Sequence, residues 1–229
     1  MKKLVVLTGA GISAESGIST FRDSNGLWEG HDVMEVASPM GWRNNMDLVL
    51  DFYNKRRRQL HEVSPNRGHE ILAELERHFE VHIITQNVDN LHERAGSSNV
   101  IHLHGELFKV RSCGNIRDIR HWEKDLLRGD CDDEGHQLRP HIVWFGEAVP
   151  EMSRAIELAM QADIFAVVGT SLQVYPAAGL IDHAPSNSVL YYIDPKPAQL
   201  YLSGRNVRVI AETGSSGLEK MRSELLEKT

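Results

Sequence analysis

The sequence predicts an α/β fold: a Rossmann-like, doubly wound parallel sheet with a smaller lobe built from two insertions. Short apolar runs rich in β-branched residues recur along the chain, and a polar or glycine-rich turn follows each of them. Runs of this length are typical of strands buried on both faces. Amphipathic helical patterns separate several of the runs, as expected for a sheet that helices cover on both sides.

In chain order, the candidate strands are residues 4–7, 81–84, 100–103, 164–168, 189–193 and 207–210. Between and after these strands, apolar residues recur at helical spacing. The helices expected from this pattern are residues 68–79, 152–162 and 218–228.

Two stretches interrupt this alternation. Residues 20–65 contain a helical pattern at 47–62 and no clear strand, whereas residues 105–145 are rich in Gly, Asp and His and show little periodicity. Both are longer than the ~2–6 residues usual for a connection, so we expect them to form a small lobe. The sheet lobe of this single domain would then comprise residues 1–19, 66–104 and 146–229.

The composition disfavours several classes of protein. Lys and Arg total 25 against 32 Asp and Glu, and this net charge of −7 disfavours nucleic-acid binding. No apolar run approaches the ~18 residues of a membrane span, and the first run is too short for a signal peptide. Two cysteines, Cys113 and Cys131, exclude a disulfide scaffold. We expect a cytoplasmic protein, monomeric by default because almost no residues lie outside the domain.

The turn after the first strand has the spacing of a dinucleotide-binding loop. Residues 9–14 read Gly-Ala-Gly-Ile-Ser-Ala, the loose G-x-G-x-x-A pattern in which backbone amides approach a pyrophosphate. The acidic residue expected about 20 positions later, at the end of a second strand, is missing. The turn is therefore either a modified dinucleotide site or a purely structural turn.

Two further strand ends carry side chains suited to catalysis. Gln86, Asn87 and Asp89 place two amides and a carboxylate after one strand. Amides can recognise a carboxamide such as that of nicotinamide, but Asn87 or Asp89 could equally cap a helix. His102 and His104 alternate with apolar residues and so share one strand face. Either imidazole could be a general base, a metal ligand or a core residue.

Tyr53 and Arg56 are three residues apart on the helix expected at 47–62, so they share a helical face. A guanidinium and a phenol can together bind a carboxylate. The basic run at 55–58 is by itself more typical of a solvated surface.

Five ordered motifs resemble those of the sirtuin family of NAD-dependent protein deacylases, and together they span nearly the whole chain. The motifs are residues 9–18 followed by 21–22, then 85–92, 102–105, 143–147 and 169–172. The resemblance implies that NAD binds at the strand ends as a co-substrate. Its expected contacts are Gly9, Ala10, Gly11, Ser13, Glu15, Phe21, Arg22, Gln86, Asn87, Asp89, His104, Gly169, Thr170, Ser171, Asp194, Gly214 and Ser215.

The resemblance also implies a reaction. An acyl-lysine substrate would pair as an added strand with Val143, Trp144, Phe145, Gly146 and Glu147. Its acyl oxygen would attack the ribose carbon as nicotinamide leaves. His104 would then be the general base for a ribose hydroxyl, with Asn87 as the second catalytic residue. The products would be free lysine, nicotinamide and an O-acyl-ADP-ribose.

Tyr53 and Arg56 resemble the Tyr-x-x-Arg pair of the sirtuin subgroup that removes acidic acyl groups. This implies that they bind the distal carboxylate of a succinyl- or malonyl-lysine. Two alternatives stay open: a mono-ADP-ribosyltransferase on the same fold, and a non-catalytic NAD-sensing module. The intact His104 and Asn87 count against the sensing module.

The sequence departs from the family at the zinc site. Zinc-bearing sirtuins carry two Cys-x-x-Cys pairs in the segment that corresponds to about residues 109–140, where this chain has only Cys113 and Cys131. We expect structural zinc to be absent. A mixed site is the alternative, and its possible further ligands are Asp132, Asp133, His121 and His136. A smaller departure is Asp194, where the family commonly has Asn.

Overall fold

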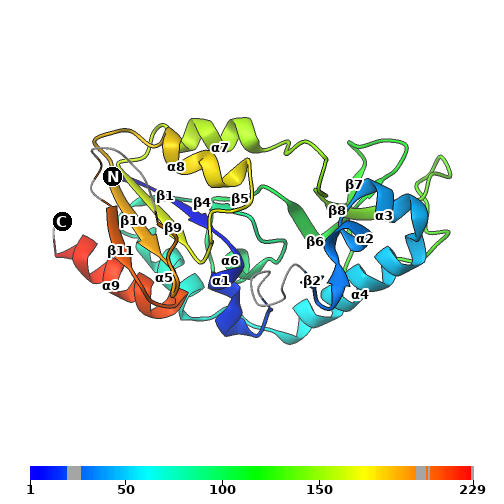
Figure 1. The fold of residues 1–229 in the computed structure, drawn as a ribbon, viewed down its shortest axis with the longest axis horizontal. Coiled ribbons are helices and arrows are strands. Elements are labelled where there is room, and N and C mark those ends of the chain that lie inside the picture. Colours follow the sequence, from blue (N-terminus) through cyan, green and yellow to red (C-terminus); the bar gives the residue numbers. More distant parts are fainter. Residues whose placement is uncertain (20–26, 200–204, 206, 228–229) are drawn as a thin grey trace.

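The centre of the computed structural model, which describes residues 1–19, 27–199, 205 and 207–227, is a six-stranded parallel sheet (Figure 1). The strands are β1 (Lys3–Thr8), β4 (Glu80–Thr85), β5 (Val100–His102), β9 (Ile164–Val168), β10 (Val189–Ile193) and β11 (Val207–Ile210). Their spatial order is β11-β10-β9-β1-β4-β5, so the order reverses beside β1. The predicted fold class is confirmed, and each predicted strand is present within one residue at either end.

Helices cover both faces because the strands are apolar on both sides. Alternate residues of β1 face opposite cores. Leu4 and Val6 pack with α5 (Arg67–Leu75) and α9 (Gly214–Leu226). Val5 and Leu7 pack with α7 (Met152–Ala159) and α8 (Leu180–His183). In Figure 1, α7 and α8 lie on one side of the sheet and α5 and α9 on the other.

The predicted helices are present with shifted ends. The helix expected from residue 68 begins at Arg67, because the side chain of Asn66 accepts the Gly68 amide at 2.9 Å. The last helix begins at Gly214, four residues before the predicted start. Its first turn holds two glycines, which disfavour helix in isolation. There is no room for a larger residue at Gly217, where a Cβ would lie 2.2 Å from Ile193.

The two insertions lie together at the other end of the molecule and make up the small lobe (Figure 1). The elements of the first insertion are β2 (Leu27–Trp28), β3 (His31–Asp32), α2 (Val33–Val36), α3 (Pro39–Asn44) and α4 (Met46–Glu62). The second insertion forms an antiparallel sheet in the order β7-β6-β8. Its strands are β6 (Gly105–Ser112), β7 (Ile119–His121) and β8 (Leu138–Ile142).

Two short strands are present at 20–65, where the sequence showed no clear strand, and residues 105–145 form a three-stranded sheet although their sequence has little periodicity. β2 and β3 are only two residues long each, too short for a periodic pattern. The pairing of β6 with β8 shifts register between Gly105 and Val110, which breaks the alternation of apolar residues. β8 also buries a charged residue, Arg139, where a core strand would be expected to carry an apolar one.

None of the described helices is long and apolar enough to cross a membrane.

A buried polar contact joins the two insertions. The Asn54 side chain on α4 donates to the Leu126 carbonyl at 2.9 Å and accepts from the Leu126 amide at 2.8 Å. Arg57 donates to the Asn54 amide oxygen at 2.7 Å and to the Leu107 carbonyl of β6 at 2.9 Å. Both side chains are buried, so these bonds satisfy backbone groups that water does not reach.

We expect Asn54→Ala to lower the free energy of unfolding by roughly 2–4 kcal/mol, because three buried hydrogen-bonding groups lose their partner. Urea unfolding of the purified protein measures this loss. Lys55→Ala, an exposed change on the same helix, is the control. Equal stabilities of the two variants would contradict the structural role assigned to Asn54.

Candidate functional site

The turns that follow β1 and β9 meet at the carboxyl edge of the sheet, where the strand order reverses. The Gly9 amide donates to the Val168 carbonyl at 3.0 Å, and the Gly11 amide donates to the Gly169 carbonyl at 2.8 Å. A Cβ on Gly11 would lie 2.6 Å from the Gly169 Cα, and one on Gly9 would lie 2.6 Å from the Thr170 Cβ. Glycine is required at these positions because the two turns touch, which supports the interpretation of residues 9–14 as a structural turn. A structural role does not exclude dinucleotide binding, since this crevice is where such folds bind ligands.

A buried hydrogen-bond network joins the first turn to the segment after β4. Asn87 donates Nδ2 to the Gly9 carbonyl and to Ser13 Oγ, both at 3.1 Å. Ser13 in turn donates to Asp89 Oδ2 at 3.0 Å. Both hydrogens of the Asn87 amide are thus committed, which leaves its Oδ1 to accept a hydrogen bond from a ligand. Burial raises the pKa of Asp89, although hydrogen bonds from the Leu91 amide and Ser13 oppose the effect.

The helix-capping reading of this segment is only partly correct. The N-cap of α6 (Leu91–Arg94) is Asn90, and its side chain makes no capping bond. Asp89 Oδ1 accepts the Leu91 amide at 3.1 Å, so Asp89 both supports the helix start and belongs to the network. Asn87 has no capping role.

The structure distinguishes the chemical roles of His102 and His104, which sequence spacing could not do. His102 contacts Glu93 Oε1 through Nε2 at 2.7 Å and the Asn87 carbonyl through Nδ1 at 3.2 Å. Because both partners are acceptors, both ring nitrogens donate and the ring is protonated. Burial by itself lowers the pKa of His102, but the Glu93 carboxylate outweighs burial and the pKa is raised. His102 is therefore part of an ion pair rather than a base.

His104 has the properties of a general base. Its Nδ1 lies 3.0 Å from the Gln86 carbonyl, an acceptor, so Nδ1 carries the proton of the neutral ring. Nε2 then holds the lone pair that can take a proton. Burial lowers the pKa of His104, with the Gln86 carbonyl opposing it, so the ring is neutral near pH 7.

Two buried histidines next to the Asn87–Ser13–Asp89 network were not identified as site residues from the sequence. His69 Nδ1 accepts the Asn66 amide at 3.2 Å, so Nε2 carries the proton and faces Ser13 Oγ at 3.5 Å. His92 Nε2 lies 3.1 Å from Thr8 Oγ1. Burial lowers the pKa of His69 to about 4 and also lowers that of His92, so both rings are neutral. His92 stands in the second motif, but only the fold brings His69 beside Ser13.

The remaining expected NAD contacts lie around the same edge. Gln86 donates to Thr170 Oγ1 at 3.2 Å. Glu15 accepts the Ser215 amide at 2.9 Å, which brings the start of α9, including Gly214, to the first turn. Asp194 follows β10, and its Oδ1 accepts the Lys196 amide at 2.8 Å. Ala10 lies in α1 (Ala10–Ser13), and Ser171 follows Thr170 after β9. Phe21 and Arg22 lie outside the described residues.

Residues 143–147 run from the His104 backbone toward the small lobe. The Val143 amide donates to the His104 carbonyl and the Phe145 amide to the Ala37 carbonyl, both at 2.9 Å. The Trp144 ring is buried and donates Nε1 to the Tyr53 hydroxyl at 2.9 Å, whereas Phe145 is exposed. Gly146 has a φ of 88°, which favours glycine at that turn.

The Glu147 side chain anchors this segment rather than facing outward. Arg139 donates to its two oxygens at 2.7 and 3.2 Å, and Arg111 donates to both at 3.1 and 3.2 Å. Glu147 also accepts the Trp144 amide at 2.9 Å, while the Arg139 guanidinium stacks 3.3 Å from the Trp144 ring centroid. Such charge-assisted bonds hold a turn in one conformation.

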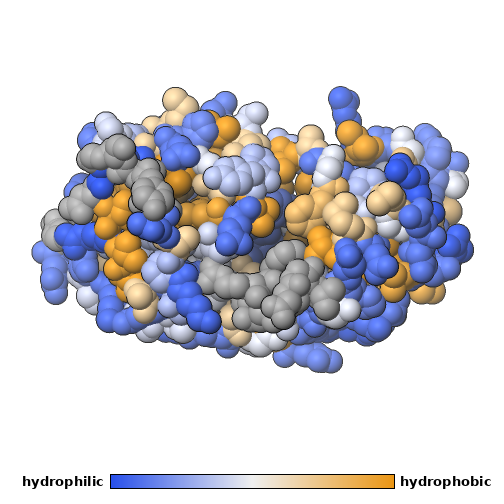
Figure 2. All heavy atoms as spheres, in the orientation of Figure 1, coloured by the Kyte–Doolittle hydropathy of each residue, from blue (hydrophilic) through white to orange (hydrophobic). Residues whose placement is uncertain are grey.

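Arg56 lines a small cavity that also includes Asp89, so the cavity adjoins the network. Its Nε and Nη1 atoms are buried and have no hydrogen-bond partner among the described residues. Tyr53 does not line this cavity; it is fully buried behind it. Burial raises the pKa of Tyr53, so the phenol keeps its proton, and because its oxygen accepts from Trp144 that proton is available to donate. Figure 2 shows apolar residues along the centre of this face, between the sheet and the small lobe.

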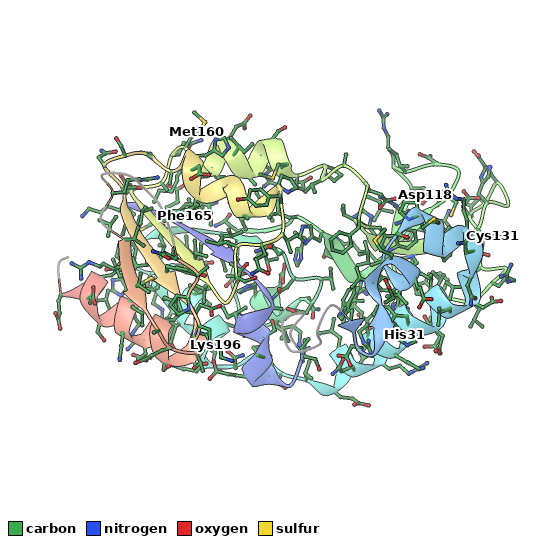
Figure 3. All side chains as sticks on the ribbon, viewed as in Figure 1. His31, Asp118, Cys131, Met160, Phe165 and Lys196 are labelled. Atoms are coloured by element: carbon green, nitrogen blue, oxygen red, sulfur yellow. The ribbon has the colours of Figure 1, made fainter. Side chains whose placement is uncertain are left out.

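The segment between β6 and β8 does not fit the structural zinc of the zinc-bearing sirtuins. Cys-x-x-Cys spacing places the partners of Cys113 and Cys131 at Ile116, which has no ligand atom, and at Glu134, whose side chain is 78% exposed. Cys131 lies at the outer end of the small lobe (Figure 3). Among the residues described, no three potential ligands are grouped.

Asp132 holds this segment through hydrogen bonds. Its Oδ2 accepts from Ser112 Oγ at 2.6 Å and contacts His136 Nδ1 at 3.2 Å, and Oδ1 accepts two backbone amides at 3.0 and 2.8 Å. These bonds, that from Ser112 foremost, lower the pKa of Asp132. His121 is paired with Glu123 at 2.8 Å. The candidate ligands of a mixed site are thus engaged with other groups.

The sheet and its strand-end groups define an α/β protein of the dinucleotide-binding class. The family model described as the Sir2 family matches residues 9–176. A protein of Helicobacter pylori named NAD-dependent protein deacylase is 59% identical over 227 residues, 99% of each chain. One of the same name from Bacteroides thetaiotaomicron is 54% identical over 232 residues, again 99% of each chain. The chain belongs to the Sir2 family.

Solved structures agree with this assignment. A complex of a Sir2 homolog with NAD is 37% identical, with a TM-score of 0.88 over 99% of this chain and 90% of that chain. A Sir2 homologue variant in complex with ADP ribose is 36% identical, with a TM-score of 0.89 over 99% and 93% of the two chains.

We expect Asp132→Asn to lower the melting temperature, because an amide cannot replace a carboxylate that accepts four hydrogen bonds. Asp133→Asn, an exposed change beside it, is the control. A zinc chelator should leave the melting temperature of the wild type unchanged. A chelator-induced loss of stability, or one equivalent of zinc in the purified protein, would contradict the hydrogen-bonded account.

Proposed function

We propose that this protein is an NAD-dependent protein-lysine deacylase that removes acetyl groups and also succinyl and malonyl groups. The observation that carries the proposal is the neutral His104, fixed by the Gln86 carbonyl beside the Asn87–Ser13–Asp89 network. The relatives named NAD-dependent protein deacylase support it. A Sir2 structure that holds a deacetylated peptide and an O-acetyl ADP ribose, 29% identical to this chain, supports nicotinamide and O-acyl-ADP-ribose as products.

The NAD site of this proposal is the carboxyl edge of the sheet. NAD supplies the ribose that accepts the acyl group. In this proposal NAD lies against the turns at 9–13 and 169–171. The amides of Gly9, Gly11 and Gly169 donate to main-chain carbonyls, so these glycines serve to bring the two turns together. Asn87 Oδ1 can accept from the nicotinamide carboxamide, and Asp89 keeps Ser13 and Asn87 in place. All the NAD contacts expected from the sequence stay predictions, among them Phe21, Arg22, Asp194, Gly214 and Ser215.

His104 acts on a ribose hydroxyl in this proposal. Its Nε2 accepts the hydroxyl proton, which makes the oxygen a nucleophile toward the acyl carbon. The Gln86 carbonyl keeps the ring in the tautomer that has Nε2 unprotonated, so His104 needs no other residue to become a base. The His102–Glu93 pair fixes the neighbouring backbone through the Asn87 carbonyl.

The peptide site of this proposal is the 143–147 segment. A substrate strand would pair with its backbone, and Glu147 would contribute by holding the segment through Arg139 and Arg111 rather than by contacting the peptide. The exposed Phe145 is available to the substrate.

Arg56 is the residue from which we infer activity on acidic acyl groups. Leaving the buried Nε and Nη1 atoms of Arg56 without a partner among the described residues is costly, and a carboxylate would satisfy one of them. A contact of the Tyr53 hydroxyl with the same carboxylate stays a prediction, because Tyr53 is fully buried and does not line this cavity. Protein ADP-ribosyl transfer is the second candidate, since it shares the NAD site and nicotinamide release.

We expect His104→Ala to lower acyl-peptide turnover by roughly 10²- to 10⁴-fold, the usual contribution of a general base. Because burial places the pKa of His104 below the ordinary 6.5, the wild-type rate should persist at pH 6.5 and fall only at lower pH, where the base becomes protonated. Nicotinamide release with acetyl-, succinyl- and malonyl-lysine peptides measures both effects. His78→Ala, an exposed histidine, is the control.

The same assay separates the candidate functions. Nicotinamide release without an acyl peptide would favour ADP-ribosyl transfer. Bound NAD without release would favour the sensing module, and an acid limit at or above pH 6.5 would contradict the role assigned to His104.

We expect Arg56→Met to lower kcat/KM for succinyl-lysine peptides by about tenfold to a hundredfold and to leave acetyl-lysine activity nearly unchanged, since a charged hydrogen bond is worth roughly 1.5–3 kcal/mol. Lys55→Met, the exposed neighbouring cation, is the control. Equal losses on both substrates would rule out an acyl-selecting role.

A further inference from the structure

The β2–β3 hairpin carries a carboxylate to the Arg56 cavity. Its turn residues, Glu29 and Gly30, have φ values of 51° and 82°, the arrangement of a two-residue primed turn. Asn, Asp or Gly is usual at such positions, and a longer side chain there is strained. A glutamate at the first position is therefore not explained by the needs of the turn.

Aromatic contacts fix the hairpin over α4. The Trp28 ring meets Phe52 edge-to-face at 5.0 Å and Tyr53 at 6.1 Å. On the other strand His31, labelled in Figure 3, meets Phe52 at 5.7 Å. One helical turn beyond Phe52, the Arg56 guanidinium lies 4.8 Å from the Phe52 ring centroid. The hairpin and Arg56 thus pack on the same ring, so Glu29 is held beside Arg56.

The position of Glu29 bears on how Arg56 can bind a second carboxylate. Arg56 Nη2 lies 3.9 Å from Glu29 Oε2, and the two side chains are only 15% and 24% exposed. A guanidinium binds a carboxylate through two nitrogens, either Nε with Nη2 or Nη1 with Nη2. Both pairs include Nη2, the atom that faces Glu29. An acidic acyl group must therefore share that atom with a negative charge already present.

We propose that Glu29 is a specificity-determining residue for the acyl group. This inference rests on the proposed deacylase function. With a neutral acyl group in the cavity, Glu29 supplies the counter-charge that the largely buried Arg56 needs. With an acidic acyl group, the Glu29 carboxylate competes for Arg56 and repels the incoming charge. Glu29 thus retains activity on acetyl-lysine at the expense of preference for succinyl- or malonyl-lysine.

The test is the ratio of kcat/KM for succinyl-lysine to that for acetyl-lysine in the same peptide. Glu29→Gln removes the charge and keeps the shape, and the ratio should rise about threefold to tenfold, the scale of a partly exposed ion pair. The dissociation constant of the succinyl peptide, measured by fluorescence anisotropy, should fall by a similar factor. Glu35→Gln, an exposed change of equal charge on the same lobe, should leave both values unchanged.

Glu29→Asn separates this role from a structural one. Asparagine suits a positive φ, so the melting temperature should stay the same or rise, while the ratio should still increase. An unchanged ratio in both Glu29 variants, with Arg56→Met selectively losing succinyl activity, would overturn the role of Glu29 and leave the proposed function standing. A wild type inactive on succinyl-lysine with an active Glu29→Gln would support it. Wild type and both variants active on acetyl-lysine alone would overturn the role of Glu29 and the acidic-acyl part of the proposed function, and would leave the acetyl-lysine part standing.

Discussion

Two glycine turns at the carboxyl ends of β1 and β9 approach more closely than side chains would allow. Gly11 and Gly169 pack main chain against main chain, and a Cβ on either would lie within about 2.6 Å of the other turn. This approach fixes the Gly9 carbonyl, to which Asn87 donates, and places Ser13 between Asn87 and Asp89. The geometry around the NAD edge therefore depends on two strands adjacent in space but about 160 residues apart in sequence.

In the small lobe, buried polar groups join the two insertions beside the apolar core that both insertions share. Asn54 and Arg57 satisfy backbone groups of the second insertion, and Asp132 gathers the turn between β6 and β8. Each bond contributes modestly, but losing a partner costs more because the remaining group is left without water. The same logic applies to Glu147, whose two arginine partners connect β6 and β8 to the proposed peptide-binding segment.

The sequence was a good guide where one physical signal dominated. The six sheet strands were predictable because burial on both faces requires continuous apolar runs. β6 and β8 were not, since a register shift and a buried arginine disrupt their alternation. Asn87, Asp89 and His104 could be nominated from strand ends, but the partners that distinguish His104 from His102 come from residues 86, 87 and 93. His69 carried no local signal, because its contact with Ser13 is a tertiary one.

The sequence alone determined the fold class, the family motifs and the residue types available for catalysis, because these depend on local pattern and order along the chain. Only the tertiary structure decided that His104 is neutral, that Tyr53 is buried and does not line the Arg56 cavity, and that Glu29 faces Arg56. The physical reason is common to all three. Protonation, burial and charge pairing are set by neighbours in space, and the chain brings those neighbours together only when it folds.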